Sequence, residues 1–89
     1  MYQLNTLVNK INKKFEEFNL KENIDIRISS NKNFEFQINN LVKYQTHKDI
    51  ESLSLSISDI LKNEELIDNF EITESKFINL KIAIDKFIF

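Results

Sequence analysis

The stretch KFINLKIAI, residues 76–84, alternates between two kinds of side chain along its whole length. One face of an extended chain would carry only aliphatic side chains, those of Ile78, Leu80, Ile82 and Ile84. The opposite face would carry Phe77, Asn79, Lys81 and Ala83. This period of two predicts a β-strand with one buried face. Asn79 stands in its middle and points away from the main apolar face, although asparagine is depleted in strands.

Two segments in the first half of the chain have the same alternation. Residues 23–29, NIDIRIS, predict a half-buried strand, because one of its faces carries only isoleucine: Ile24, Ile26 and Ile28. Residues 34–37, FEFQ, alternate again. The polar SSNKN at 29–33 lies between them and favours a turn, so the two strands are expected to pair as a hairpin.

Two longer segments have helical periodicity. Residues 46–63 are ambiguous, since SLSLSIS has the period of a strand while the longer window has that of a helix. About 15 residues is long for a strand, so we expect a helix, with Thr46 as its N-cap and Leu55 off its apolar stripe. Residues 2–18 predict an amphipathic helix, whose apolar stripe is Leu4, Leu7, Val8, Ile11, Phe15 and Phe18.

The remaining segments are shorter. Residues 38–44, INNLVKY, suit a short helix, and 63–75 hold an acidic connection and a short strand through Phe70 and Ile72. The order of these elements predicts an α+β fold with two layers, an antiparallel sheet with helices on one face, in the order α-β-β-α-β-β. Eighty-nine residues without a linker form a single domain, 1–89.

The composition excludes several classes of function. The chain has no glycine, hence no glycine-rich phosphate loop, and no cysteine, hence no disulfide and no thiolate metal site. Its net charge is −2 and Arg27 is its only arginine, whereas a stand-alone nucleic-acid-binding domain is usually basic. No segment approaches the roughly 20 apolar residues of a membrane span, and no signal peptide is visible. We therefore expect a soluble protein with no membrane contact; the absence of cysteine leaves the compartment open, and a cytoplasmic protein needs no disulfides.

Side chains suited to catalysis or metal binding are sparse. His47 is the only histidine and follows the expected N-cap, where an exposed or capping role is the simpler interpretation. Glu64, Glu65 and Asp68 form an acidic cluster without the opposed environments of an acid–base pair or the spacing of a calcium loop. We expect no catalytic site, no metal site and no cofactor in this chain.

Two short segments place amides beside aromatic rings, FEFQIN at 34–39 and KFIN at 76–79. Amides and rings together can read an unpaired base, through hydrogen bonds to its edge and stacking on its face. In the alternative interpretation, Gln37 and Asn39 cap a helix and Asn79 faces water. The residue types leave both interpretations open, and the second is the simpler.

In their order and spacing, these segments resemble the N-terminal additional domain of arginyl-tRNA synthetases. That family opens with an amphipathic helix, carries G-D-Y-Q-x-N before its second helical region, and has G-F-I-N ahead of an apolar strand near its end. Here the motifs read Phe34-Glu35-Phe36-Gln37-Ile38-Asn39 and Lys76-Phe77-Ile78-Asn79. The resemblance covers essentially all 89 residues. Phe34 and Lys76 stand where the family has glycine.

The resemblance implies a role in binding tRNA. Domains of this family contact the elbow of the tRNA, and the asparagine of F-I-N helps to read a D-loop nucleotide. By this resemblance Asn79 would hydrogen-bond a base, Phe77 would pack beside it, and Lys81 would lie near phosphate. Gln37 and Asn39 would hold the domain together.

The resemblance also implies the partners of the chain. It would be an accessory domain of an arginine–tRNA ligase, with tRNA, bound weakly by this domain alone, and the rest of the synthetase as partners. ATP and arginine are bound elsewhere in such an enzyme. The alternative is a free-standing small protein of the same fold that acts as a protein-interaction module, which the lost glycines and the acidic balance favour.

Overall fold

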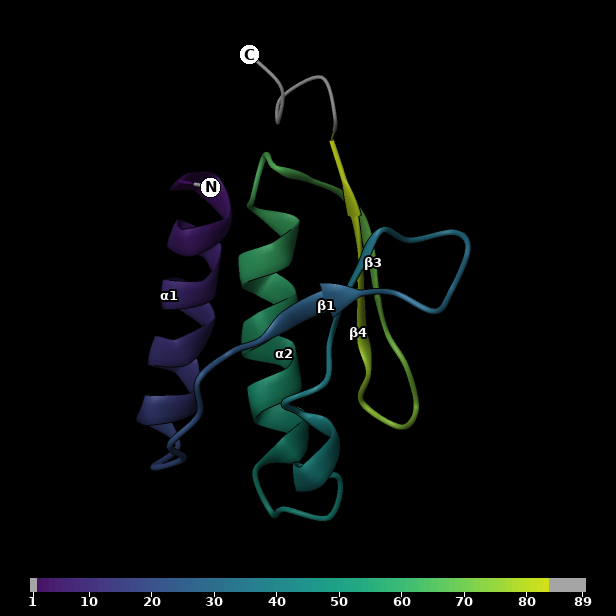
Figure 1. Cartoon of the computed structure of the whole chain (residues 1–89). Helices are drawn as coiled ribbons and strands as arrows, with labels where there is room; N and C mark the ends of the chain where they lie inside the picture. The colour runs from purple at the N-terminus through teal and green to yellow at the C-terminus, as the bar shows by residue number, and fades with distance from the viewer. Residues whose placement is uncertain (1, 84–89) are drawn as a thin grey trace.

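The computed structural model describes residues 2–83, with the side chains of residues 5–83. In chain order the elements are helix α1 (Tyr2–Glu17), strands β1 (Ile26–Ile28) and β2 (Phe36–Ile38), the 3₁₀-helix η1 (Val42–Tyr44), helix α2 (Ile50–Lys62), and strands β3 (Ile67–Ile72) and β4 (Ile78–Ile82) (Figure 1). The predicted order α-β-β-α-β-β is confirmed. No helix within residues 2–83 is long and apolar enough to cross a membrane.

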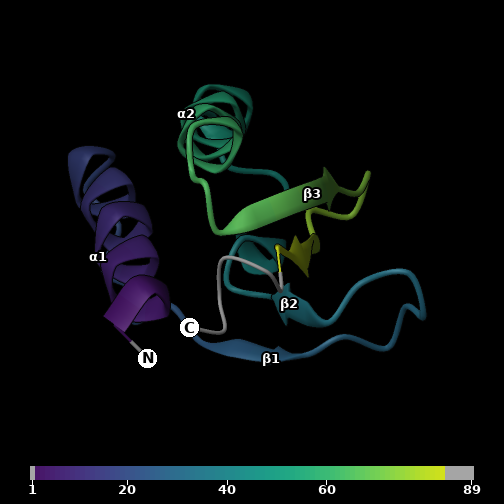
Figure 2. The ribbon, with the colours of Figure 1, turned by 90° about the horizontal axis from the view of Figure 1, so that it is seen from above.

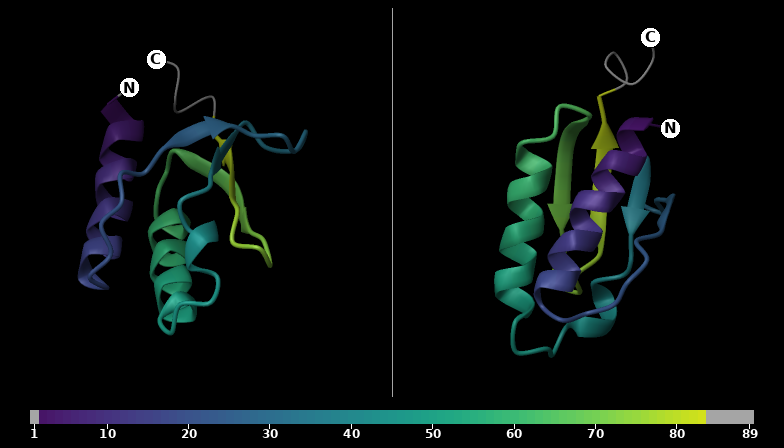
Figure 3. Two further views of the ribbon diagram at one scale, coloured as in Figure 1. Left: turned by 60° about the horizontal axis from the view of Figure 1, so that its bottom comes forward. Right: turned by 90° about the vertical axis from the view of Figure 1, so that its left-hand side faces the viewer.

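The four strands form one antiparallel sheet in the order β1-β2-β4-β3. The strand predicted over 76–84 is therefore a central one, in which Asn79 faces Gln37 of β2 on one side and Glu71 of β3 on the other. Ile84 lies outside the described residues. Both helices lie on the same side of the sheet (Figures 2 and 3), which confirms the two-layer arrangement.

The core lies between the helices and the inner face of the sheet. Its fully buried side chains come from both layers, because the helix stripes and the aliphatic faces of the central strands meet there. Leu55 is 66% exposed, as its place off the stripe of α2 predicts. The largest fully buried side chains are Phe15, Leu7, Ile11, Ile38, Leu41, Leu53, Ile57, Leu61, Ile78 and Leu80.

Helix α1 ends in a left-handed turn at Asn19, where φ is 61°. The backbone N–H of Leu20 donates to the carbonyl of Phe15 at 2.9 Å, and that of Asn19 to the carbonyl of Glu16 at 2.9 Å, which is the Schellman pattern. Glycine usually takes this position, and asparagine is among the few other residues that tolerate it. In this glycine-free chain an asparagine therefore closes the helix.

The second helix begins later than predicted, at Ile50, and Thr46 is not its N-cap. The N-cap residue is Asp49, whose side chain makes no capping hydrogen bond. The residues just before Asp49 form a turn around His47 instead. His47 Nδ1 accepts a hydrogen bond from the backbone N–H of Asp49 at 3.0 Å, and the His47 carbonyl accepts one from Ile50 at 3.1 Å.

The short helix predicted over 38–44 is reduced to the single turn η1. Ile38 belongs to β2, where it pairs with Ile26 on one side and Ile78 on the other. The strand continues through Ile38 because this position is fully buried in the core.

The prediction that the isoleucines of residues 23–29 form one buried face is only partly correct. Ile24 is buried and Ile26 is half-buried, but Ile28 is 85% exposed. β1 is an edge strand, and the edge of a twisted sheet turns away from the layer that covers its centre. Figure 3 shows β1 running away from both helices, so the last isoleucine of the strand has no layer to pack against.

Candidate nucleic-acid interface

The face of the sheet opposite the helices carries a row of polar side chains that crosses all four strands. Antiparallel pairing places Arg27 opposite Gln37, Gln37 opposite Asn79, and Asn79 opposite Glu71. Side chains directly opposite one another on the same face are close enough to interact. The helices lie on the other side of the sheet (Figure 2), so this row faces outward.

Asn79 is the centre of the row and is buried by its neighbours, with 3% of its surface exposed. Its Oδ1 accepts hydrogen bonds from Gln37 Nε2 at 3.0 Å and from Ser29 Oγ at 3.4 Å. Its Nδ2 donates to Glu71 Oε1 at 3.3 Å. Both ends of the amide are therefore used, and the side chain links the β1–β2 turn, β2 and β3.

These contacts account for an asparagine in the middle of a strand. A buried amide is stable when its donor and acceptor atoms are both paired, and the row supplies partners on each side. The predicted direction of Asn79, away from the apolar face, is correct. The alternative in which Asn79 faces water is wrong, because neighbouring polar side chains cover it.

Lys81 is exposed and lies one pleat further along β4, where it pairs with Asn69 of β3. Glu35 of the first motif lies on the β2 side of this position. Its Oε1 accepts a hydrogen bond from the backbone N–H of Ile82 at 2.7 Å, and its own N–H donates to the carbonyl of Leu80 at 3.1 Å. The carboxylate and backbone of Glu35 thus continue the β2–β4 ladder just ahead of the start of β2.

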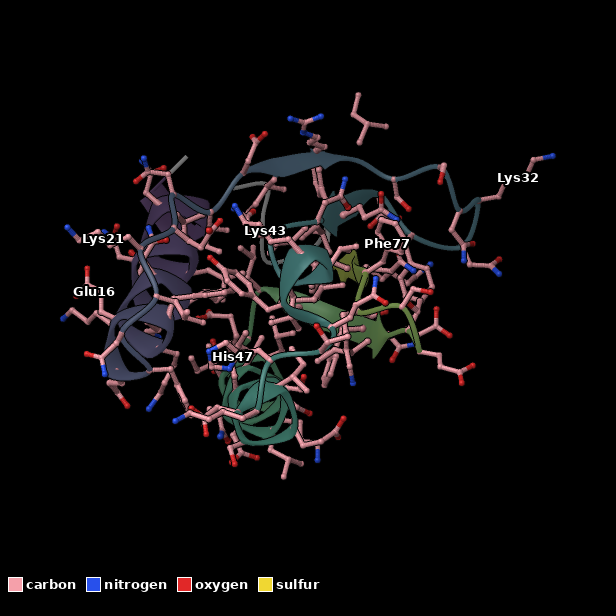
Figure 4. The ribbon with its side chains drawn as sticks, turned by 90° about the horizontal axis from the view of Figure 1, so that it is seen from below. Glu16, Lys21, Lys32, Lys43, His47 and Phe77 are labelled. Carbon is pink, nitrogen blue, oxygen red and sulfur yellow. The ribbon has the colours of Figure 1, made fainter. Side chains whose placement is uncertain are left out.

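The other end of the uncovered face holds a cavity of about 630 Å³. Asn39 and Phe77 come together here because Asn39 follows β2 directly and Phe77 precedes β4 directly, at opposed positions of the antiparallel pair. In Figure 4 the labelled side chains of Lys43 and Phe77 lie on either side of η1, and β1 runs along the top of the view. The cavity is lined by Glu22, Asn23, Asp25, Arg27, Asn39, Asn40, Val42, Lys43 and Phe77.

One wall of the cavity is a hydrogen-bonded network around Glu22, whose side chain is 5% exposed. The carboxylate accepts from Lys43 Nζ at 2.7 Å, from Asn40 Nδ2 at 2.8 Å and from the hydroxyl of Tyr44. Burial acts to raise the pKa of Glu22, but the bonds from Lys43, Tyr44 and Asn40 outweigh it and hold that pKa below its ordinary value. The bond to Glu22, together with burial, raises the pKa of Tyr44 to about 12.

Asn39 differs from the other amides of this region. Its Oδ1 is buried and has no hydrogen-bond partner among the described residues. Asn40, the next residue, is fully engaged: it donates to Glu22 and to the carbonyl of Asn23, and accepts from the backbone N–H of Asp25. The backbone carbonyl of Asn39 accepts a hydrogen bond from the N–H of Val42 at 3.1 Å, while the side chain of Asn40 ties this turn to the loop ahead of β1.

The structure separates the residues singled out from the sequence into two places. Gln37 and Asn79 lie together in the polar row, and Phe77 lies with Asn39 in the cavity. Lys81 lies apart from the cavity on the same strand. The sequence analysis missed Glu22, Lys43 and Asn40, since residues brought together from a loop and a 3₁₀-turn have no spacing signal.

Two further ion pairs involve lysines of α1. Lys10 of α1 binds Glu64 at 3.3 Å and Lys14 binds Glu17 at 3.4 Å. Within the part of the chain that the structure describes, no three His, Cys, Asp or Glu side chains are grouped so that they could hold a metal ion.

Comparison of the chain with protein-family models, with curated proteins and with solved structures found no match.

Proposed function

We propose that this chain is a non-catalytic, tRNA-binding accessory domain of a cytoplasmic arginine–tRNA ligase, which contacts the D-loop and elbow of the tRNA and positions it for aminoacylation. The observation that supports this most directly is the backbone of Lys76, where φ is 73°. A left-handed conformation disfavours residues with a β-carbon and is where glycine is expected. Lys76 stands where the G-F-I-N motif of the resemblance has glycine, and its left-handed backbone is a conformation that glycine adopts most readily.

The turn around Lys76 explains why this shape is needed. The N–H of Lys76 donates to the carbonyl of Thr73 at 2.9 Å, and the N–H of Phe77 donates to Thr73 Oγ1 at 3.0 Å. This tight turn joins β3 to β4 and sets the register of the F-I-N strand. The register determines that Phe77, Asn79 and Lys81 share the uncovered face of the sheet.

A sheet face with the ring of Phe77, the amides of Gln37 and Asn79 and the exposed Lys81 suits contact with an unpaired RNA loop. In this proposal Lys81 lies near phosphate and the Asn79 N–H that now donates to Glu71 is the group offered to a base. Affinity from this domain alone is weak, because a net charge of −2 opposes binding to a polyanion. Its contribution to catalysis is orientation of the tRNA, while ATP and arginine are bound by the rest of the enzyme.

Aminoacylation kinetics of the intact polypeptide that carries this sequence test the proposal. Lys81→Glu should raise the KM for tRNA several-fold and leave the KM values for ATP and arginine unchanged. Lys62→Glu is the matched control, because Lys62 is also exposed but lies at the end of α2, in the helix layer. Equal effects of the two substitutions, or no effect of either, would exclude a specific tRNA contact on the uncovered face.

The size of the native product distinguishes the proposal from its alternative. An antibody to this domain should detect a polypeptide several times longer than 89 residues in source cells. A product of 89 residues would favour the free-standing protein-interaction module.

A further inference from the structure

We infer that two copies of this chain associate through β1, with the two β1 strands antiparallel about a two-fold axis at Ile26 and with Asp25 of each copy opposite Arg27 of the other. β1 lies at one edge of the sheet (Figure 2), and no strand within residues 2–83 pairs with its outer side. An uncovered edge strand has unpaired backbone N–H and C=O groups, which makes it a template for a further strand. This inference goes beyond the proposed RNA-binding function and does not depend on it.

The hydrogen bonds next to β1 show which of its backbone groups point to the open edge. The N–H of Ser29 donates to the carbonyl of Glu35 at 3.0 Å, on the side of the strand that faces β2. Hydrogen-bonded positions alternate along an antiparallel ladder. Arg27, two positions earlier, therefore faces β2 as well, and Ile26 and Ile28 direct their N–H and C=O outward. These two residues are the ones that can bond to a second strand.

Charge selects one register among those that this alternation allows. With the axis at Ile26, the two copies of Ile26 exchange both backbone hydrogen bonds, and Asp25 lies opposite Arg27 on either side of the axis. An axis at Arg27 would place two arginines directly opposite each other. An axis at Ile28 would place Arg27 opposite Ser29 and form no ion pair. Opposite charges on facing strands stabilise the pairing, and like charges destabilise it.

The two charged side chains are accessible for this contact. Arg27 Nε binds Asp25 Oδ2 of its own chain at 2.8 Å, and the two side chains are 67% and 58% exposed. A guanidinium has further N–H donors besides Nε, so each arginine can bridge the carboxylate of its own chain and that of the partner copy. Acidic and basic side chains then alternate across the axis, on the face of the sheet away from the helices.

The exposure of Ile28 is accounted for by the same pairing. In one chain this side chain is 85% exposed, because β1 runs away from the helix layer. In the proposed register Ile28 lies opposite Ile24 of the partner copy. Ile24 is buried beside α1, where its N–H donates to Asn12 Oδ1 at 3.0 Å. The partner copy thus supplies the apolar layer that Ile28 lacks in its own chain.

Size-exclusion chromatography with light scattering, on the intact polypeptide that carries this sequence, tests the inference. The mass should rise with concentration from one protomer to two and no further, because a two-fold contact closes on itself. A short strand pair buries little surface, so the dimer should be weak. A protomer mass at the highest attainable concentration, or a mass beyond two protomers, would overturn the inference.

Charge substitutions distinguish this register from any other dimer. Arg27→Asp makes both charged positions of β1 acidic and Asp25→Arg makes both basic, so either change should raise the dissociation constant of the dimer roughly tenfold or more. The two changes in one chain restore opposite charges and should return the constant to near the wild-type value. An equimolar mixture of the two single variants should form mixed dimers, because an acidic strand then faces a basic one. Unchanged dimerisation of the single variants, or no association in the mixture, would contradict the register.

A pair of apolar substitutions tests the contact of Ile28. Ile28→Ala should raise the dissociation constant several-fold and leave the melting temperature close to that of the wild type, because the side chain has little to contact in its own chain. Leu55→Ala is the matched control, since Leu55 is exposed on α2, away from the sheet edge. Equal dissociation constants for these two variants would mean that Ile28 does not lie in the contact, and would overturn the inference.

Discussion

Gln37 Nε2 donates a hydrogen bond of 3.0 Å to Asn79 Oδ1, directly across the β2–β4 ladder, between residues 42 positions apart in the chain. Gln37 belongs to the motif FEFQIN at 34–39, and Asn79 belongs to the motif KFIN at 76–79. The amides of the two motifs therefore form one hydrogen-bonded unit in the centre of the sheet.

A double-mutant cycle on Gln37 and Asn79 should reveal this coupling. Asn79→Ala leaves the amide of Gln37 without its acceptor and removes the bonds to Ser29 and Glu71, so it should reduce the free energy of unfolding by about 1 to 3 kcal/mol. Gln37→Ala should cost less, because Gln37 is only half-buried. Urea denaturation should show a coupling of about 0.5–1.5 kcal/mol between the two sites. If the losses in free energy of unfolding of the two single mutants simply add in the double mutant, the hydrogen bond between Gln37 and Asn79 is not contributing.

The same substitution should reduce stability much more at a buried leucine than at an exposed one. Leu80 is fully buried in the central strand, so Leu80→Ala should cost about 2–5 kcal/mol through lost burial and the cavity left behind. Leu55 is 66% exposed, and Leu55→Ala should change stability by less than about 0.5 kcal/mol. Thermal unfolding followed by circular dichroism measures both. A comparable loss at Leu55 would mean that another surface covers it.

The network around Glu22 should make the free energy of unfolding depend on pH in the acidic range. The folded pKa of Glu22 lies below its ordinary value of 4.5, so the stabilisation is present above pH 4.5 and is lost as pH falls through the lower, folded value. At pH 7 Glu22→Gln should cost about 1–3 kcal/mol, through weaker bonds to Lys43 and Tyr44. The difference in free energy of unfolding between the wild type and Glu22→Gln should become smaller below pH 4.5.

A matched control for that titration is Glu16→Gln, since Glu16 is exposed on α1. Its free energy of unfolding at pH 7 should lie within about 0.5 kcal/mol of the wild-type value, because the substitution is on the surface. If the difference in free energy of unfolding between the wild type and Glu22→Gln stays constant from neutral to acidic pH, titration of Glu22 does not contribute to stability.

The left-handed backbone at Lys76 should make glycine the better residue there. Lys76→Gly relieves the clash of a β-carbon at φ 73°, and Lys76→Ala retains it, while both remove the ion pair with Glu51. The glycine variant should therefore be more stable than the alanine variant by about 1 kcal/mol. Equal stabilities, measured by chemical denaturation, would mean that the turn relaxes away from this conformation.

Much of the fold follows from local pattern alone. The alternation in residues 76–84 and the helical stripe of 2–18 each reflect burial on one face, and the structure confirms both within the described residues. The start of α2 was mispredicted because a threonine at a suitable distance resembles a cap, whereas the backbone there closes a turn around His47. Ile28 was mispredicted because alternation reports the face of a strand and says nothing of how far the covering layer extends.

The candidate site was predictable only in part. The face on which Phe77, Asn79 and Lys81 lie follows from the period of two, but the burial of Asn79 does not, because it depends on Gln37, Ser29 and Glu71 arriving from other elements. The cavity depends likewise on tertiary contacts, between a loop, a 3₁₀-turn and two strands.

The place of β4 between β2 and β3 has a consequence for how the chain folds as it is synthesised. The β1–β2 hairpin and β3 make no ladder with each other, and β4 alone joins them. The sheet therefore stays in two pieces on the ribosome until residues 78–82 have left the exit tunnel. Until then the aliphatic faces of the hairpin and of β3 have only the helices to cover them, so the cooperative closure of this sheet depends on β4, which is made after the three other strands of the sheet.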